Sequence, residues 1–449
     1  MDKAKIITEL GKFISIKSVS ANPKMKSEMD WAVNFLTKKL ESLKFKVEIF
    51  QKRGSQKILL AVLEIPNASK TIGIYGHYDV QPEDPVGEWN SAPFTLTREN
   101  GKLFGRGVAD NKGHIIQNIS AIENLLARGQ LKSSIIFLIE GAEEVGSLGL
   151  EGCVVENKKI LDTIDVFFLT DVEMYGKNIP QIIYSLRGMV YFDVEVIIGE
   201  HDLHSGIYGN AVHNPAQILV DLLAKMKDMQ TGEVLIPGFY DDVRKIGDAE
   251  LQVLKKHSMT DDEFVSKAGA YEATSMRGVP AYFAPKLFPS LDVHGFESGY
   301  LGEGPKTIIP SKARVKFSCR LVENQDVKKM GNIIRTFIND YFKEIKKISS
   351  PQIEIKTYPY DNPFYCSIDD LFLQKTAKIL SEHFGHKTVF MREGGSLPVA
   401  SIIQRILKKP VVMTGFVLPD SNIHAPNENF DEEMFWKGIG ALEKLYSDI

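Results

Sequence analysis

The amino-acid sequence predicts an α/β protein with a largely parallel sheet, flanked by helices and interrupted by a smaller inserted α+β domain. Three observations carry this prediction. Strand-like and helical apolar patterns alternate in the N-terminal part, the pattern changes at Gly188, and the alternation returns after Tyr360. We therefore expect residues 1–187 and 359–449 to form one domain and residues 188–358 to form the inserted one.

The composition limits the classes of function. A chain of 449 residues exceeds one ordinary core, so at least two domains are expected. The net charge is −4 and the basic residues form no stripe, so we expect no nucleic-acid partner. Three widely spaced cysteines suit a reducing cytoplasm better than a disulfide framework. No window approaches the run of about eighteen apolar residues that marks a membrane span.

The N-terminal elements follow from hydrophobic spacing. Residues 3–16 and 27–44 repeat apolar side chains with the period of a helix. Residues 46–50 and 57–65 are typical of short strands, and residues 71–77 of a buried strand. These segments predict two helices followed by the first strands of the sheet.

The next stretch carries the alternation that favours a parallel sheet. A short strand at 102–106 precedes a helix over 111–128, and buried strands follow at 134–139 and 165–169. Strands separated by helical segments of this length predict parallel pairing, because parallel neighbours need a long crossover connection.

The inserted segment has the order strand-helix-strand-strand-helix-strand, which is the ferredoxin-like arrangement. Its elements are expected at residues 190–198, 215–226, 290–294, 313–321, 327–345 and 353–357. Between its first helix and second strand lies an insertion over residues 231–287, with helical spacing at 249–256.

The C-terminal part resumes the helix and strand alternation. Its elements are expected at residues 371–384, 388–391, 397–407, 411–415 and 431–447. This return to the first pattern is the reason for assigning residues 359–449 to the same domain as the N-terminal part.

Polar residues follow the strand-like runs. His77 and Asp79 lie two residues apart, a spacing that puts both side chains on one face of a strand. The others, each after its own apolar run, are Glu143, Glu144, Asp171 and His424. Because ligands of open α/β sheets bind at the carboxyl ends of the strands, we expect these residues to converge on one crevice.

Two histidines and several carboxylates are a donor set suited to Zn²⁺ or Mn²⁺. Carboxylates packed this closely repel one another unless cations neutralise them, and two ions bridged by one carboxylate meet that demand. Asp110, in a glycine-rich stretch before a predicted helix, is the natural bridge. As an alternative, Asp110 caps that helix.

Glu143 and Glu144 are adjacent, so their side chains cannot point the same way. One carboxylate can bind metal while the other acts as general base. In isolation, a solvated charge pair is the simpler reading of Glu143 and Glu144. As alternatives, Asp171 is a turn residue at a strand end, and His424 is a loop residue without a role. Together, at successive strand ends, they favour the metal site.

Several blocks, met in order along nearly the whole chain, resemble the signature blocks of the M20 family of dinuclear zinc peptidases. They are Gly76-His77-Tyr78-Asp79-Val80, the run 105–113, Glu140-Gly141-Ala142-Glu143-Glu144, Asp171, His201-Asp202-Leu203-His204-Ser205-Gly206, Arg392-Glu393-Gly394-Gly395-Ser396 and His424. Within the family, the chain is most similar to the carnosinase and cytosolic non-specific dipeptidase branch.

The resemblance implies a zinc-exopeptidase fold with a lid and dimerisation domain, and a role for each metal-site residue. His77 and Asp171 would hold one divalent ion, Glu144 and His424 the other, and Asp110 would bridge them. Asp79 would orient His77, and Glu143 would be the general base. Zn²⁺ is the expected ion, with Mn²⁺ or Co²⁺ as alternatives. The family often has a cis peptide after the bridging Asp, here Asp110-Asn111.

The resemblance also implies contacts from the inserted domain. His204 resembles the residue that stabilises the oxyanion, often from the second subunit of a homodimer; a surface histidine is the alternative. Arg320 and Thr307 resemble the contacts to the substrate carboxylate, for which a planar guanidinium is suited. Gly395 and Ser396, just before a helix, would add backbone N–H donors for the same anion.

The expected function is metal-dependent hydrolysis of dipeptides or very short peptides by a water that two metal ions activate. An alternative is an N-acyl-amino-acid amidohydrolase of the deacetylase or desuccinylase type, which would share the metals and the base. A third hypothesis is a non-catalytic metal-binding protein on the same fold. We expect a cytoplasmic homodimer that acts on a small peptide and has neither a nucleic-acid nor a membrane partner.

Overall fold

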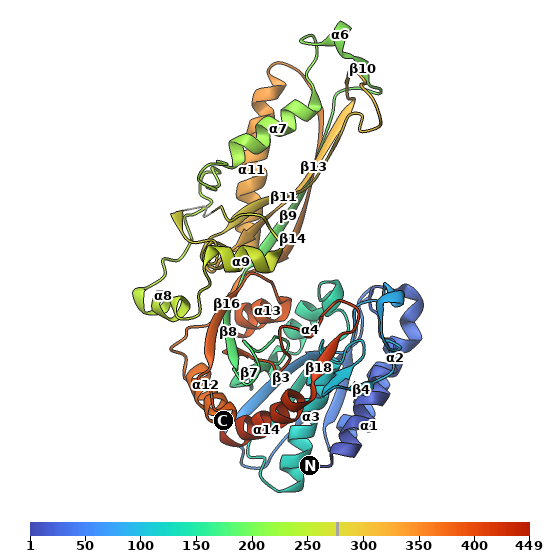
Figure 1. The fold of residues 1–449 in the computed structure, drawn as a ribbon, viewed down its shortest axis with the longest axis vertical. Coiled ribbons are helices and arrows are strands. Elements are labelled where there is room, and N and C mark those ends of the chain that lie inside the picture. The colour runs from blue at the N-terminus through green and yellow to red at the C-terminus, as the bar shows by residue number, and fades with distance from the viewer. Residues whose placement is uncertain (275–277) are drawn as a thin grey trace. The chain divides into compact units, whose positions relative to one another are not determined.

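The computed structural model describes residues 1–274 and 278–449 (Figure 1). The chain divides into two compact units. The first comprises residues 1–184, 366–391 and 398–449, and the second comprises residues 185–365 and 392–397.

A nine-stranded sheet, most of whose strands lie in the first unit, has the order β1-β2-β6-β3-β7-β17-β8-β15, and β16 also pairs with β8. Its strands are β1 (Lys46–Phe50), β2 (Ile58–Leu63), β3 (Thr71–His77), β6 (Ser134–Glu140), β7 (Val166–Leu169), β8 (Gln181–Leu186), β15 (Phe364–Tyr365), β16 (Val389–Glu393) and β17 (Val411–Met413). The strand β8 continues into the second unit, where Ser185 and Leu186 pair with β15.

The centre of this sheet is parallel. The neighbours β6, β3, β7 and β17 run in the same direction, which confirms the prediction for the core of the sheet. The outer pairs β1–β2, β2–β6, β17–β8 and β8–β15 are antiparallel, so the sheet is mixed. The segment 51–57 between β1 and β2 is too short for a crossover, and a hairpin is the only connection it permits.

Helices cover the sheet. They are α1 (Lys3–Ile14), α2 (Lys26–Ser42), α3 (Lys112–Ala127), α4 (Leu150–Glu156), α5 (Lys158–Leu161), α12 (Leu371–Phe384), α13 (Pro398–Leu407) and α14 (Glu432–Asp448). The helix α3 is buried along most of its length and packs against α1 and α14. A small sheet of β4 (Thr97–Glu99), β5 (Lys102–Phe104) and β18 (Asn429–Asp431) joins the segment before α3 to the one before α14.

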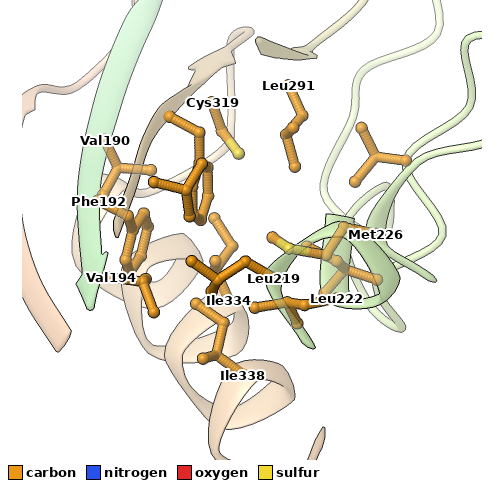
Figure 2. Packing of buried hydrophobic residues seen from close by; sticks show 14 of the residues in the cluster. Val190, Phe192, Val194, Leu219, Leu222, Met226, Leu291, Cys319, Ile334 and Ile338 are labelled. Atoms are coloured by element: carbon orange, nitrogen blue, oxygen red, sulfur yellow. The ribbon is translucent and has the colours of Figure 1, made fainter. Parts of the chain in front are cut away.

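The second unit contains a four-stranded antiparallel sheet with the order β11-β13-β9-β14, which is the predicted ferredoxin-like arrangement. Its strands are β9 (Gly188–Ile197), β11 (Ser290–Ser298), β13 (Lys312–Leu321) and β14 (Gln352–Asp361). The helices α7 (Pro215–Met226) and α11 (Val327–Lys346) cover one face (Figure 1). Apolar side chains of both helices and of β9 and β13 form the core of this unit (Figure 2).

Further short elements complete the second unit. They are β10 (Leu203–His204), α6 (Ser205–Tyr208), α8 (Asp248–Lys255), α9 (Asp261–Ala268), α10 (Ala284–Leu287) and β12 (Ile308–Ile309). The helices α8, α9 and α10 lie in the insertion over residues 231–287, of which 275–277 are outside the described residues.

The units differ from the predicted domains at their junctions. The expected boundary at 358/359 is wrong, because β14 keeps its pairing with β9 as far as Asp361 and the unit ends at Tyr365. Residues 392–397, which the sequence assigned to the N-terminal domain, belong to the second unit. There the Arg392 side chain pairs with two glutamates of that unit.

In the described residues, every helix is too short or too polar to cross a lipid bilayer.

Candidate metal centre

The site lies over the carboxyl ends of β6, β3, β7 and β17, four adjacent parallel strands. His77 is the last residue of β3, and Asp171 follows β7 by two residues. Glu143 and Glu144 open a short 3-10 turn after β6, Glu143–Val145, and His424 lies in the loop that follows β17. The structure brings the metal-ligand candidates together at this edge of the sheet.

The first group consists of His77, Asp110 and Asp171. His77 Nε2 lies 2.9 Å from Asp110 Oδ1 and 3.5 Å from Asp171 Oδ1. The His77 side chain is fully buried and those of Asp171 and Asp110 are 9% and 15% exposed, so this group is largely shielded from solvent.

The second group consists of Asp110, Glu144 and His424. His424 Nε2 lies 2.9 Å from Asp110 Oδ2 and 3.1 Å from Glu144 Oε2. Asp110 therefore presents one carboxylate oxygen to each group. It does not cap α3, which has Asn111 at its N-cap and begins at Lys112, so the capping alternative is wrong. The Asp110-Asn111 peptide bond is cis.

Asp79 acts on more than His77. His77 Nδ1 lies 3.1 Å from the main-chain oxygen of Asp79 and 3.4 Å from its Oδ1. The two carboxylate oxygens of Asp79 also accept hydrogen bonds from the backbone N–H groups of Glu143 and Glu144, at 3.3 and 3.2 Å. One buried carboxylate thus holds both the histidine and the turn that carries the two glutamates.

The site concentrates negative charge. Burial and the neighbouring carboxylate of Asp171 raise the pKa of Glu143 well above its usual range, although His77 opposes this. Hydrogen bonds to Asp110 and Glu144 raise the pKa of His424 to about 10, against the effect of burial. Burial lowers the pKa of His77, but nearby carboxylates, Asp171 foremost, outweigh it and raise that pKa well above its usual value. Each shift follows from the concentration of carboxylates, which favours positive charge in the site.

These residues fit divalent metal ions. In each group the three donor atoms lie within 4.8 Å of one another, and imidazole nitrogen with carboxylate oxygen is a usual donor set for zinc and similar ions. Glu144 Oε1 is buried and has no hydrogen-bond partner in the described part of the chain, as expected of an oxygen that awaits a cation. His77, Asp110 and Asp171 would hold one ion, and Asp110, Glu144 and His424 the other.

Two supporting residues went unrecognised in the sequence. Glu428 is fully buried and accepts hydrogen bonds from the backbone N–H groups of Gly107, Ala109 and Asp110, at 2.8 to 3.0 Å, and from Arg106 Nη1 at 2.8 Å. Asn111 Nδ2 donates to Asp171 Oδ1 at 2.6 Å. Neither residue lies at a strand end, the signal by which the others were found.

The substrate-binding candidates belong to the second unit, where they divide into two sets. Arg320, Gly395 and Ser396 lie together with Arg187. The backbone N–H of Arg187 donates to Gly395 O at 3.1 Å, and its Nε donates to Gly394 O at 3.3 Å. Burial and the charge of Arg320 lower the pKa of Arg187 to about 10, which places two guanidinium groups near each other.

Two acidic residues accompany this basic set, Asp292 near Arg187 and Asp361 near Arg320. Burial raises the pKa of Asp361, whereas a hydrogen bond to Ser396 and the charge of Arg320 act against that rise. Among the described residues no ion pair is formed by Arg187 or Arg320, so the surroundings suit an added carboxylate.

His204 and Thr307 form the other set. β10 and β12 pair His204 with Ile308, and the Thr307 carbonyl accepts a hydrogen bond from the N–H of Ser205 at 3.1 Å. The two-stranded sheet of β10 and β12 lies beyond the end of β13 that begins at Lys312, whereas Arg320 is near the other end of that strand (Figure 1). At about 3.3 Å per residue, the strand alone separates the two sets by roughly 26 Å.

Parallel strands whose carboxyl ends gather histidines and carboxylates into candidate metal-binding groups are typical of metallohydrolases. The sequence profile of peptidase family M20/M25/M40 matches residues 73–448, and the chain belongs to this family.

Several characterised proteins are similar over most of their length. The Cys-Gly metallodipeptidase dug1 of Schizosaccharomyces pombe is 31% identical, over 97% of this chain and 94% of that protein. The Beta-Ala-His dipeptidase of Homo sapiens is 32% identical, over 87% of this chain and 77% of that one. The crystal structure of the M20 family metallo-carboxypeptidase Sso-CP2 from Sulfolobus solfataricus is 30% identical and superposes with a TM-score of 0.87, covering 100% of this chain and 99% of that one.

Proposed function

We propose that this M20 peptidase hydrolyses dipeptides or very short peptides with two divalent ions, Zn²⁺ foremost and Mn²⁺ or Co²⁺ as alternatives. The observation that carries the proposal is the Asp110 carboxylate, which offers Oδ1 to His77 and Oδ2 to His424. A carboxylate shared in this way is the arrangement expected of a bridge between two ions.

The residues divide the chemistry among themselves. The bound ions would supply Lewis acidity, which polarises the scissile carbonyl and makes water more acidic. Glu143 would accept a proton from the attacking water and donate it to the amine nitrogen as the C–N bond breaks. Asp79 would keep Glu143 in place, because its carboxylate accepts a hydrogen bond from the backbone N–H of Glu143.

Arg320, assisted by Arg187 and Ser396, would bind the carboxylate of the substrate. A carboxylate there would relieve the repulsion between the two guanidinium groups and gain charge-assisted hydrogen bonds. Recognition of a free carboxylate explains why the substrates would be short or cleaved from the end.

The relatives favour a peptidase over the N-acyl-amino-acid amidohydrolase. Two of them bear dipeptidase names, Cys-Gly and Beta-Ala-His. The second candidate is a carboxypeptidase acting on longer peptides, because Sso-CP2 is titled a metallo-carboxypeptidase and covers the entire chain. For localisation we propose the cytoplasm, since Cys153, Cys319 and Cys366 are free thiols.

We also propose a homodimer that completes the site. A dipeptide spans only about 7 Å, whereas the length of β13 from Lys312 to Arg320, roughly 26 Å, lies between His204 and Arg320 in one unit, so one subunit cannot bring both to the same substrate. The partner subunit's His204 would then stabilise the oxyanion. Exposed apolar side chains on α6, α7 and β11, among them Ile207, Val220 and Phe296, support an interface on this unit.

Replacement of the proposed base tests the mechanism. We expect Glu143→Gln to lose at least about a hundredfold in kcat on a dipeptide, the scale of general-base removal, while metal content stays near normal. The metal content is measured by elemental analysis of the purified variant. Retained turnover would refute the role of Glu143.

A substrate panel separates the candidate activities. Dipeptides, N-acetyl and N-succinyl amino acids, and a pentapeptide are compared by kcat/KM. We expect the dipeptides to lead. Faster release of C-terminal residues from the pentapeptide would identify a carboxypeptidase, and preference for the acylated amino acids would identify an amidohydrolase.

A further inference from the structure

Arg392 anchors the segment 392–397 inside the second unit. Its side chain is 1% exposed, and its Nη1 donates to Glu250 Oε1 at 2.7 Å. A second terminal nitrogen, Nη2, donates to Glu323, and Nε donates to the main-chain oxygen of Lys286 at 2.9 Å. The guanidinium therefore contacts three separate parts of the chain.

The anchor is reciprocal. Lys286 Nζ donates back to the main-chain oxygen of Arg392 at 2.8 Å. Arg244 joins both glutamates, with Nη2 at 2.6 Å from Glu250 and 3.1 Å from Glu323. Arg244, Glu250 and Lys286 all come from the insertion over residues 231–287, whereas Glu323 follows β13. The insertion thus supplies most of the Arg392 contacts described above.

The anchored segment carries the carboxylate-binding candidates. Gly394, Gly395 and Ser396 follow Arg392 within four residues, and Arg187 holds the first two by their carbonyl oxygens. A shift of the backbone at Arg392 would also move Ser396, because the segment between them is too short to absorb the displacement. The position of Ser396 relative to Arg320 therefore depends on the insertion.

Stability does not account for this arrangement. Burying several charges is costly, and well-packed apolar side chains in their place are often neutral or more stable. A guanidinium in a fixed fork of carboxylates, by contrast, defines both position and direction of the main chain that bears it.

We propose that Arg392, with Glu250 and Glu323, is a positioning group that sets the carboxylate-binding segment, and that the 231–287 insertion serves to hold it. This rests on the proposed function, in which Arg320 and Ser396 bind the free carboxylate of a peptide. The group touches neither the metal ligands nor Glu143, so it governs substrate affinity and not the chemical step.

The test is steady-state kinetics of Glu250→Gln and Arg392→Lys. We expect KM for a dipeptide with a free carboxylate to rise about tenfold or more, since small misplacements of a binding group are costly. The value of kcat and the metal content should stay within twofold, and KM for the C-terminally amidated dipeptide should not change. Arg392→Lys retains the charge but not the fork, so its effect separates geometry from charge.

The matched control is Asp193→Asn. Asp193 is also buried, and its Oδ1 accepts a hydrogen bond of 2.7 Å from Nε of Arg314 on β13. It contacts no part of the 392–397 segment. An equal rise in KM in this variant, or a loss confined to kcat in Glu250→Gln, would overturn the proposal.

Hydrogen exchange gives a readout that needs no activity. In Glu250→Gln the backbone amides of residues 394–396 should exchange faster than in the wild type, whereas those of β9 should not. Unchanged exchange at 394–396 would overturn the proposal even if no dipeptide were hydrolysed. An inactive wild-type enzyme with faster exchange in the variant would refute the proposed function and leave the positioning role supported.

Discussion

Glu428 fixes the backbone that presents Asp110. Its carboxylate collects three N–H groups between Gly107 and Asp110 and pairs with Arg106, and it lies four residues after His424. The Glu428 side chain therefore connects Asp110, which belongs to both groups, to the loop that carries His424, the most exposed of the candidate ligands. At the residue scale, the geometry of the centre depends on this carboxylate as much as on the ligands themselves.

Glu428→Gln should weaken metal binding by about 10- to 100-fold, because its amide nitrogen cannot accept the hydrogen bonds that now fix Asp110. The affinity is measured by calorimetric titration of metal-free protein with Zn²⁺. Glu432→Gln, which removes a more exposed glutamate paired with Arg98, serves as the control and should leave the affinity unchanged. Equal affinity of the two variants would contradict the role of Glu428.

Metal affinity should fall as the pH falls. The pKa of His424 is raised from 6.5 to about 10 by Asp110 and Glu144, so at neutral pH the metal-free site carries a proton that an ion must displace. In the metal-free protein the same shift stabilises the fold below pH 6.5, and this contribution is lost as the pH rises through about 10.

Titrations near pH 6 and pH 8, each in two buffers of different ionisation enthalpy, would reveal the displaced protons. Binding without proton release, or with equal affinity at both pH values, would show that His424 is neutral before the ion arrives.

The strand-end residues were predictable, and their supports were not. His77, Asp171 and His424 follow apolar runs, and such runs can be recognised in the sequence. Glu428 and Arg187 act through contacts with backbone groups that are distant in the sequence. The residues adjacent to them in the sequence give no indication of those contacts.

At the scale of elements, the beginning of α3 is packed tightly against the turn that precedes it. A Cβ on Gly113 would lie 1.9 Å from the main-chain oxygen of Val108, so only glycine permits the approach between the helix and the turn that presents Asp110. The helix and the metal centre are therefore packed as one piece.

Gly113→Ala should lower the free energy of unfolding by about 1–3 kcal/mol, since backbone atoms must move to admit the methyl group. The comparison is Gly87→Ala, where a Cβ would meet nothing within 4 Å. Urea unfolding followed by fluorescence would measure both variants. A loss in Gly113→Ala no greater than that in Gly87→Ala would show that the turn adapts freely.

The sequence predicted most elements but did not reveal which way the outer strands of the main sheet pair. Helices such as α7 and α12 have the predicted bounds, because their apolar faces repeat over several turns. The strand β8 was not predicted, and its buried run Gln181–Leu186 has no alternation that distinguishes a strand from another buried segment. The direction of pairing at the edges depends on connections and neighbours that no single segment encodes.

At the scale of the whole molecule, the separation of His204 from Arg320 makes the homodimer a requirement of the proposed mechanism. Thr307 lies beside His204 and would arrive with it from the partner. The two halves of the substrate site would then belong to different chains, and neither chain would be active alone.

Mixed dimers test this division. His204→Ala and Glu143→Gln should each abolish turnover, whereas coexpressed with different tags they should restore about a quarter of the wild-type activity, because half of the dimers hold one complete site. No restoration in tag-purified mixed dimers would place the action of His204 within its own subunit.

The domain organisation was predictable in outline, because the ferredoxin-like order of strands and helices is visible in the hydrophobic pattern. The transfer of residues 392–397 to the second unit was not, since it depends on the ion pairs of one arginine with Glu250 and Glu323. Such long-range pairs leave no periodic signal.

The unequal exposure of the two histidines has a consequence for how the enzyme acquires its ions. His77 is sealed in the interior, whereas 52% of the His424 side chain is open to water. Of the two proposed ions, the one beside His424 should therefore exchange with the medium much faster than the one beside His77. A brief exposure to a second metal would then replace the ion beside His424 but not the one beside His77. The enzyme would then contain two different metals, and their positions would depend on the order in which they were added.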